Sequence, residues 1–203
     1  MEQWPAQKVL PVVHHLKKAK TFYMKKILVV VASFLAFQAG AQIKQATLQA
    51  SGLTCAMCSK AIYKSLEKLP FAEKIQSNIK ESSFTITFKP NEAVDFDAIK
   101  MAVEDAGFAV ANLKVTANFN EVAIANDAHV VIGGESLHFL NVKPQVLKGD
   151  NVFQVIDKKF VSDKVHSKYA AATKMPCYTS GVMENNTGLQ DQSSATRIYH
   201  VTI

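Results

Sequence analysis

Two cysteines separated by two residues constrain this chain more than any other feature. They lie in residues 52–58 (GLTCAMC), between a predicted strand and a predicted helix. A loop that enters a helix can aim both sulfurs at one point, and the unpaired N–H groups and partial positive charge of the helix N-terminus favour thiolate over thiol. Thiolates select soft ions such as Cu(I) and Zn(II) over hard ions. We therefore predict an exposed metal site formed by Cys55 and Cys58.

The residues around this motif predict the order strand, helix, strand, strand, helix, strand. The strands alternate apolar and polar residues, and the helices repeat apolar residues at three- and four-residue steps. Strands are expected at 43–52, 72–79, 82–88 and 108–117, and helices at 58–68 and 95–106. Asp95 is placed to cap the second helix and Gly107 to end it. This order is the ferredoxin-like arrangement, in which two helices cover one face of an antiparallel sheet.

With this motif and this order of elements, residues 43–117 resemble a heavy-metal-associated domain. This is the fold of copper chaperones and of the N-terminal modules of metal-pumping ATPases. The family motif Gly-Met-Thr-Cys-x-x-Cys matches residues 52–58, with Leu53 in place of the usual Met. The resemblance implies that Cys55 and Cys58 are the metal ligands.

The resemblance also carries expectations about the ion and its partners. Thr54 matches the copper-type members of the family, and Phe108 falls where ATPase-type modules carry an aromatic residue that covers the loop. Met57, between the two cysteines, is expected to be exposed or packed on the loop rather than a third ligand. We expect Cu(I), with Zn(II) or another soft divalent ion as the alternative, and a metal-transporting ATPase or another metal donor or acceptor as the partner.

The composition of the chain and its N-terminal residues predict where the protein is located. Residues 1–41 carry six lysines and one acid, so the remaining chain has 17 basic and 16 acidic residues and no basic stripe that would suggest nucleic-acid binding. Lys25-Lys26, the apolar run Ile27–Phe37 and Ala39-Gly40-Ala41 form a signal-peptide pattern, too short for a comfortable membrane span. We therefore expect an exported protein, periplasmic or secreted, without a stable membrane span after cleavage.

The residues before this pattern have two explanations. Met24 is a candidate natural start, and residues 1–23 are then either an over-extended reading frame or an unusually long positive region. The expected organisation is a leader at 1–41, a heavy-metal-associated domain at 42–118 and a second domain at 119–203.

The second half predicts strands rather than helices. Strand-like runs occur at 122–125, 129–132, 136–140, 152–156, 168–173 and 196–203. Turn signals separate them, such as Gly133-Gly134 and Lys148-Gly149-Asp150. We expect a small all-β domain, a barrel or a sandwich, with residues 185–194 as an exposed loop. The fold class is thus α+β: a ferredoxin-like βαββαβ domain followed by an all-β domain.

The second half also contains soft-metal ligands without a ligand spacing. They are His129, His138, His166, His200, Met175, Cys177 and Met183. A lone buried cysteine more often acts as a small hydrophobic residue, and methionine as a gap-filler. A second metal site therefore stays an open alternative at this point.

The composite expectation is an exported metal-binding protein, not an enzyme, that carries or buffers Cu(I) and transfers it by thiolate ligand exchange. The alternative is an extracytoplasmic thiol–disulfide oxidoreductase that uses Cys55 and Cys58, although the order of elements differs from a thioredoxin fold. A structural disulfide or an empty site are further alternatives. In a last alternative, the first half acts only in sensing or recruitment, and the second half binds a partner.

Overall fold

The computed structural model describes residues 41–53, 56–183 and 196–203. These residues belong to one compact unit, Gly40–Ile203. The predicted signal pattern and the loop expected at 185–194 lie outside the described residues. Within the described part of the chain, no helix is both long and apolar enough to cross a membrane.

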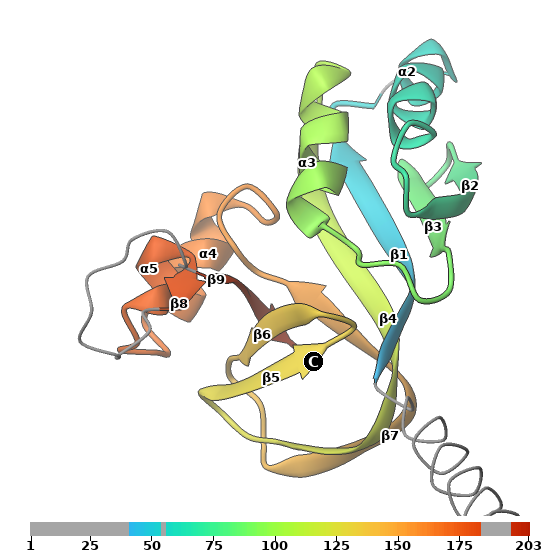
Figure 1. The fold of residues 1–203 in the computed structure, drawn as a ribbon. Coiled ribbons are helices and arrows are strands. Elements are labelled where there is room, and N and C mark those ends of the chain that lie inside the picture. The colour runs from blue at the N-terminus through green and yellow to red at the C-terminus, as the bar shows by residue number, and fades with distance from the viewer. Residues whose placement is uncertain (1–40, 54–55, 184–195) are drawn as a thin grey trace, which may run out of the picture. The chain divides into compact units, whose positions relative to one another are not determined.

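The first half has the predicted ferredoxin-like order of elements (Figure 1). The elements are β1 (Gln42–Ser51), α2 (Ala56–Leu66), β2 (Ala72–Asn78), β3 (Ser83–Phe88), α3 (Phe96–Asp105) and β4 (Ala109–Ile124). The strands pair in the order β2-β3-β1-β4, all antiparallel. The alternation that predicted β1 is visible in its burial, since Ala46, Leu48 and Ala50 face the core.

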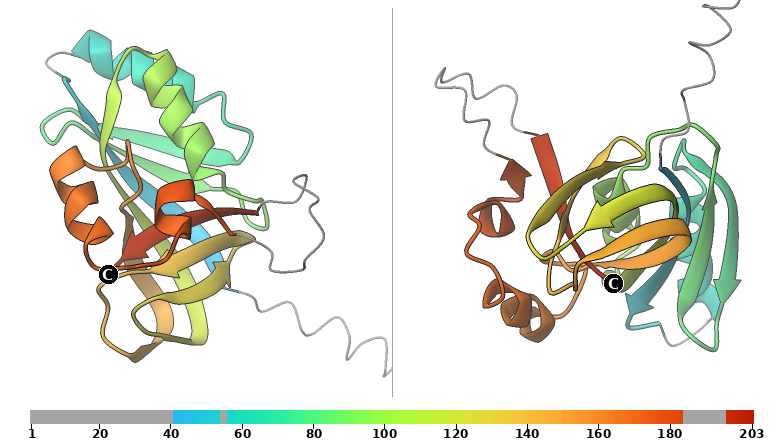
Figure 2. Two further views of the ribbon diagram at one scale, coloured as in Figure 1. Left: turned by 90° about the vertical axis from the view of Figure 1, so that its left-hand side faces the viewer. Right: turned by 90° about the horizontal axis from the view of Figure 1, so that it is seen from below.

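The two helices pack against one another on one face of this sheet (Figure 2). The predicted cap of α3 is present: the Asp95 carboxylate accepts a hydrogen bond from the Ala98 N–H at 3.0 Å. Gly107 follows the helix with φ +86°, a conformation that a residue with a Cβ adopts only with strain. These local signals explain why the boundaries of α3 were predictable.

Strand β4 is longer than predicted and joins the two halves of the chain. One edge pairs with β1 and the other with β7 (Gln145–Val155), from Leu113↔Val155 to Ile124↔Gln145. A bulge interrupts the second ladder between Phe119 and Val122. The boundary predicted between residues 118 and 119 therefore falls inside a strand that continues through it.

The remaining elements extend the same sheet. They are β5 (Ala128–Ile132), β6 (Glu135–Phe139), α4 (Asp163–Ala170), α5 (Cys177–Ser180), β8 (Val182–Met183) and β9 (Thr196–Thr202). Beyond β4 the strand order is β7-β9-β6-β5, and β8 pairs with β9. The sheet curls back on itself, because the Gly133 N–H at the β5–β6 turn donates to the Ala41 carbonyl at 3.0 Å.

Two expectations for the second half are corrected here. It is not all-β, because α4 and α5 lie within it and α4 includes part of the strand predicted at 168–173. Helix α4 has no fully buried residue and packs only Val165 and Tyr169 against a small core cluster, so its apolar pattern is too short to predict a helix. The turn predicted at 148–150 lies inside β7, where Gly149, with φ +70°, faces the bulge in β4 rather than reversing the chain.

Buried side chains from both halves meet in one core. The Phe96 ring, from α3, lies 4.9 Å from the Tyr199 ring of β9 and 6.4 Å from the Phe153 ring of β7, measured between centroids. The Tyr199 hydroxyl accepts a hydrogen bond from the Asp97 N–H at 3.2 Å and donates one to Asp95 at 3.1 Å. The first turn of α3 is thus held by the last strand of the chain.

A shared sheet and core predict one unfolding transition for residues 42–203. Replacing Phe153 by Ala, far in sequence from the metal motif, should lower the free energy of unfolding by about 3–5 kcal/mol, because it leaves a cavity under α3. Hydrogen exchange followed by mass spectrometry should show the change in peptides from both halves. Two separate transitions, with the first half unaffected by Phe153→Ala, would instead establish two independent domains.

The Tyr199 hydroxyl provides a finer test of the same connection. Tyr199→Phe should lower the free energy of unfolding by about 1–2 kcal/mol, because two hydrogen bonds to α3 are lost and the buried ring is kept. Denaturant unfolding measures the change. Tyr63→Phe, at a partly exposed position of α2, is the matched control and should leave the midpoint unchanged. Equal midpoints for the two variants would contradict the role assigned to Tyr199.

Candidate functional site

The predicted dithiol loop lies at the junction of β1 and α2. The loop starts with Gly52 at φ +78°, directly after β1, and α2 begins at Ala56. Cys58 is partly exposed in the first turn of α2, whereas Cys55 lies outside the described residues. The first turn, residues 56–59, holds no acidic residue that would offset the helix dipole. The position of Cys58 therefore favours a thiolate.

The residues around the loop have different environments. Met57, in the first turn of α2, is 74% exposed, so it projects into solvent rather than into the core. Leu53 packs against the core and anchors the start of the loop. Phe108 also packs against the core, and it precedes Ala109, which pairs with Ser51 at the end of β1. This register places Phe108 at the same end of the sheet as the loop.

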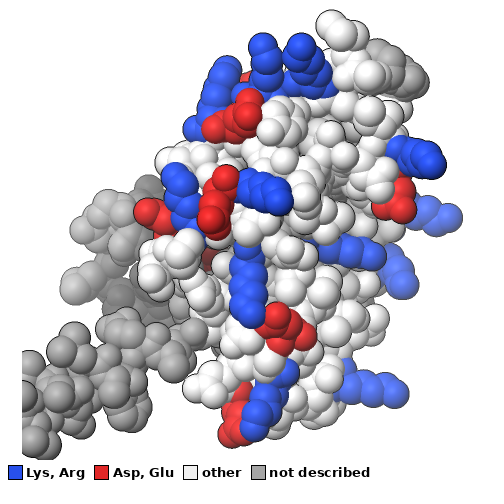
Figure 3. Space-filling model, turned by 90° about the vertical axis from the view of Figure 1, so that its right-hand side faces the viewer, with Lys and Arg blue, Asp and Glu red and all other residues white. Residues whose placement is uncertain are grey.

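Charged side chains of both signs occupy the face of the molecule shown in Figure 3. Basic side chains are spread over this face, and acidic side chains lie among them. Elsewhere in the described residues, as at Lys44–Asp150 and Lys148–Glu121, charges of opposite sign form ion pairs. This face therefore presents no continuous positive stripe.

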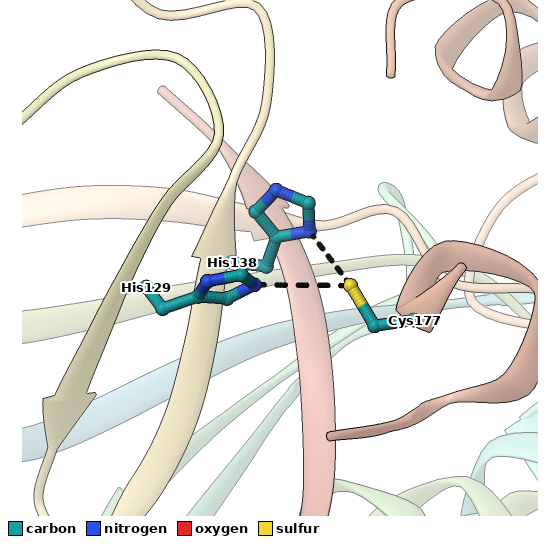
Figure 4. A group of neighbouring side chains, drawn as sticks. All are labelled: His129, His138 and Cys177. Atoms are coloured by element: carbon teal, nitrogen blue, oxygen red, sulfur yellow. Dashed lines mark hydrogen bonds between the residues drawn. The ribbon is translucent and has the colours of Figure 1, made fainter. Parts of the chain in front are cut away.

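Three ligand-type residues of the second half come together, although their spacing did not predict it. His129 lies on β5, His138 on β6 and Cys177 at the start of α5 (Figure 4). The Cys177 Sγ lies 3.5 Å from His138 Nδ1 and 3.7 Å from His129 Nε2. His138 is fully buried and Cys177 is 9% exposed, whereas His129 faces solvent.

The other candidates have different environments. His200 Nδ1 lies 2.5 Å from the Asp157 carboxylate, and its ring touches that of His138, with 5.1 Å between centroids. His166 stacks on Tyr178. Met175 is exposed and Met183 lies on β8. Within the described residues, neither His166 nor His200 joins the group formed by His129, His138 and Cys177.

Burial sets the protonation of this group. Desolvation, together with the neighbouring His129 and His200, lowers the pKa of His138 to about 4. Desolvation also lowers the pKa of His129 and raises the pKa of Cys177. At neutral pH the imidazoles are therefore uncharged and the Cys177 thiol keeps its proton.

A hairpin register could have revealed the histidine pair from sequence. Gly133 and Gly134 both have positive φ, as a two-residue hairpin turn requires. Counting outward from this turn pairs Ile132 with Glu135 and then His129 with His138, which is the observed register. No comparable local signal brings Cys177 to this pair, because it is 39 residues away from His138.

Comparisons with known proteins identify a family and several relatives that match part of the chain. Residues 47–109 match the family model described as heavy-metal-associated domain. The chain is 31% identical over 83 residues to a probable copper-transporting ATPase of Arabidopsis thaliana, covering 41% of this chain and 8% of that protein. It is 34% identical over 64 residues to a probable copper-exporting P-type ATPase of Archaeoglobus fulgidus, covering 32% and 8%. The chain thus spans about a twelfth of these relatives, 8% of their length.

Among solved structures, a putative copper-ion-binding protein from Bacillus anthracis is 29% identical, with a TM-score of 0.31, and the match covers 34% of this chain and 94% of that one.

The different exposure of Cys58 and Cys177 predicts different thiol reactivity. In metal-free Cys55→Ser protein, iodoacetamide should modify Cys58 at least about tenfold faster than Cys177, because burial keeps Cys177 protonated and covered. Peptide mass spectrometry after timed quenching measures both rates. Modification of Cys177 as fast as Cys58 would point to an activated Cys–His nucleophile and against a buried thiol.

Proposed function

Because residues 47–109 are a heavy-metal-associated domain, we propose that this protein is an exported carrier or buffer of Cu(I). The observation that carries the proposal is the GLTCAMC motif within the matched region, with Cys58 in the first turn of α2. The names of the two ATPase relatives refer to copper, which supports copper as the ion. The signal-peptide pattern ending at Ala39-Gly40-Ala41 supports export.

Transfer would proceed by exchange of thiolate ligands. Cys55 and Cys58 hold Cu(I) as two thiolates. A thiolate or thioether of a partner adds as a third ligand and then displaces one of the two cysteines. The exposure of Met57 and the partial exposure of Cys58 leave room for an incoming ligand. No water is activated and no substrate bond is broken, so the mechanism needs no catalytic residue.

The proposed partner is a metal-transporting ATPase or another protein that donates or accepts Cu(I). Metal release would become easier as pH falls, because protons compete with the ion for the thiolates. Phe108, at the same end of the sheet as the loop, would limit the access of water and of further ligands on that side.

Paired cysteine variants test the carrier function. Cys55→Ser with Cys58→Ser should remove one tightly bound Cu(I) per chain while the thermal unfolding midpoint stays close to wild type, because Cys58 and the neighbouring Met57 lie outside the buried core. Anaerobic titration against a Cu(I) chelator measures the stoichiometry, and free thiols are counted in parallel. Cys177→Ser is the matched control and should keep this Cu(I).

Two outcomes would contradict the proposal. The first is a double variant that binds as many Cu(I) ions per chain as the wild type does, with unchanged affinity. The second is a wild-type chain that binds no Cu(I), resists mild reduction of a Cys55–Cys58 disulfide and turns over a protein disulfide. That second result would favour the oxidoreductase alternative.

A further inference from the structure

We propose that His129, His138 and Cys177 form a second metal site, for an ion of the zinc and copper class. The site lies in the second half of the chain, outside the heavy-metal-associated domain, and shares no residue with the dithiol loop. It does not depend on the Cu(I) carrier function proposed above.

The distances between the three ligand atoms suit one metal ion. An ion about 2.3 Å from sulfur and about 2.0 Å from nitrogen, with tetrahedral or trigonal angles, separates these ligand atoms by about 3.5–3.8 Å. The observed separations from Cys177 Sγ are 3.5 Å to His138 Nδ1 and 3.7 Å to His129 Nε2. All three ligand atoms lie within 4.8 Å of one another, and the exposed His129 ring can close the remaining gap.

The backbone holds the two imidazoles together. His129 and His138 are directly opposite one another on β5 and β6, so their side chains leave the sheet on the same face. Their ring centroids are 4.4 Å apart. Figure 4 shows both rings turned toward the Cys177 sulfur. The register of the hairpin therefore brings the two histidine side chains together.

Asp127 fixes the tautomer of His138. The His138 Nε2 lies 3.1 Å from the Asp127 Oδ1, and a carboxylate can only accept a hydrogen bond. Nε2 therefore carries the proton, and the lone pair of Nδ1 points at Cys177. A carboxylate behind the histidine is the usual outer support of a metal-bound imidazole.

The same carboxylate positions the segment that carries the cysteine. The Thr173 hydroxyl donates to Asp127 Oδ1 at 2.7 Å and accepts a hydrogen bond from the Met175 N–H at 3.1 Å. Asp127 thus orders both His138 and the chain that leads into Cys177. An isolated buried cysteine would need no such framework.

The groups present account for the proton that is released and for the lone pairs that are donated when a metal ion binds. Without an ion, the Cys177 S–H can donate to His138 Nδ1. An ion would replace that proton, which leaves to solvent, and would take the lone pairs of Nδ1 of His138 and Nε2 of His129. One thiolate and two imidazoles form a borderline-soft set that suits Zn(II) and copper, and water could take a fourth position.

A nucleophilic Cys–His pair is the competing explanation of the same geometry. Cys177 is 9% exposed and His138 is fully buried, so a substrate carbonyl could not reach the sulfur without rearrangement. A small ion could enter beside His129, which is exposed. The accessibility of the three residues therefore favours an ion over a substrate.

The test isolates this site in the full mature chain, residues 42–203, with Cys55→Ser and Cys58→Ser. The protein is titrated with Co(II) as a spectroscopic probe and then with Zn(II) and Cu(I). We expect one Co(II) per chain, with a thiolate-to-metal absorption band and intense visible bands of a four-coordinate ion, displaced by Zn(II) or Cu(I). Which of these ions binds more tightly identifies the preferred one.

Substitutions in that background assign the ligands. Cys177→Ser should abolish the thiolate band and weaken binding at least about 100-fold, and His129→Ala, at an exposed position, should weaken it at least about tenfold. Asp127→Asn, at a positioning residue, should weaken binding about 10- to 100-fold and keep the thiolate band. His166→Ala is the matched control, because His166 lies nearby on Tyr178 and outside the group, and should bind as the background does.

The result that would overturn the site is a folded background protein that takes up no stoichiometric Co(II), Zn(II) or Cu(I). Binding that survives Cys177→Ser combined with His129→Ala would do so as well. Thermal unfolding of each variant verifies the fold. Failure of the dithiol site has a separate readout, the loss of Cu(I) binding in Cys177→Ser protein that keeps Cys55 and Cys58.

Discussion

The structure depends on the pairing of β4 along both edges. In the order β2-β3-β1-β4 this strand would leave a row of unpaired backbone groups at the edge of the first half. Strand β7 satisfies those groups from Leu113 to Ile124, so the two halves share one sheet. The shared core follows from this pairing, because Phe153 on β7 and Tyr199 on β9 then lie against Phe96 at the start of α3. A substitution that destabilises the second half should therefore also destabilise α2 and α3, the helices of the first half.

The first half was predictable because its signals are local. Each strand of the ferredoxin-like unit alternates over a few residues, and Asp95 and Gly107 mark the ends of α3 by side-chain capping and by backbone conformation. The second half was harder for physical reasons. Helix α4 packs only Val165 and Tyr169 against a small core cluster, and Gly149 lies opposite a bulge rather than in a turn. The continuity of the sheet could not be read from the sequence, because it depends on pairs such as Leu113 with Val155 that are far apart along the chain.

The two candidate sites differ in the same way. The dithiol motif is contained in seven residues and needs only the strand-to-helix junction, so its chemistry could be predicted from the sequence alone. The second group needs a hairpin register for His129 and His138 and a tertiary contact for Cys177. The register that pairs His129 with His138 could have been predicted by placing Gly133-Gly134 in a two-residue turn. The contact could not, because the segment that leads to Cys177 is ordered through Asp127, across 46 residues between Thr173 and that carboxylate.

The environments of the two sites favour different uses of a metal ion. In the proposed dithiol site, two thiolates from one short motif would form a soft, two-coordinate site, and a partner could add a ligand without displacing protein. Such a site is suited to rapid exchange. Three ligands from β5, β6 and α5, two of them buried and one supported by Asp127, must separate before the ion can leave. Such a site is suited to retention. Since both sites are built on one sheet, an ion retained in the second half would stabilise the β5–β6 hairpin and, through the hydrogen bond from Gly133 to Ala41, the strand that leads into the dithiol loop.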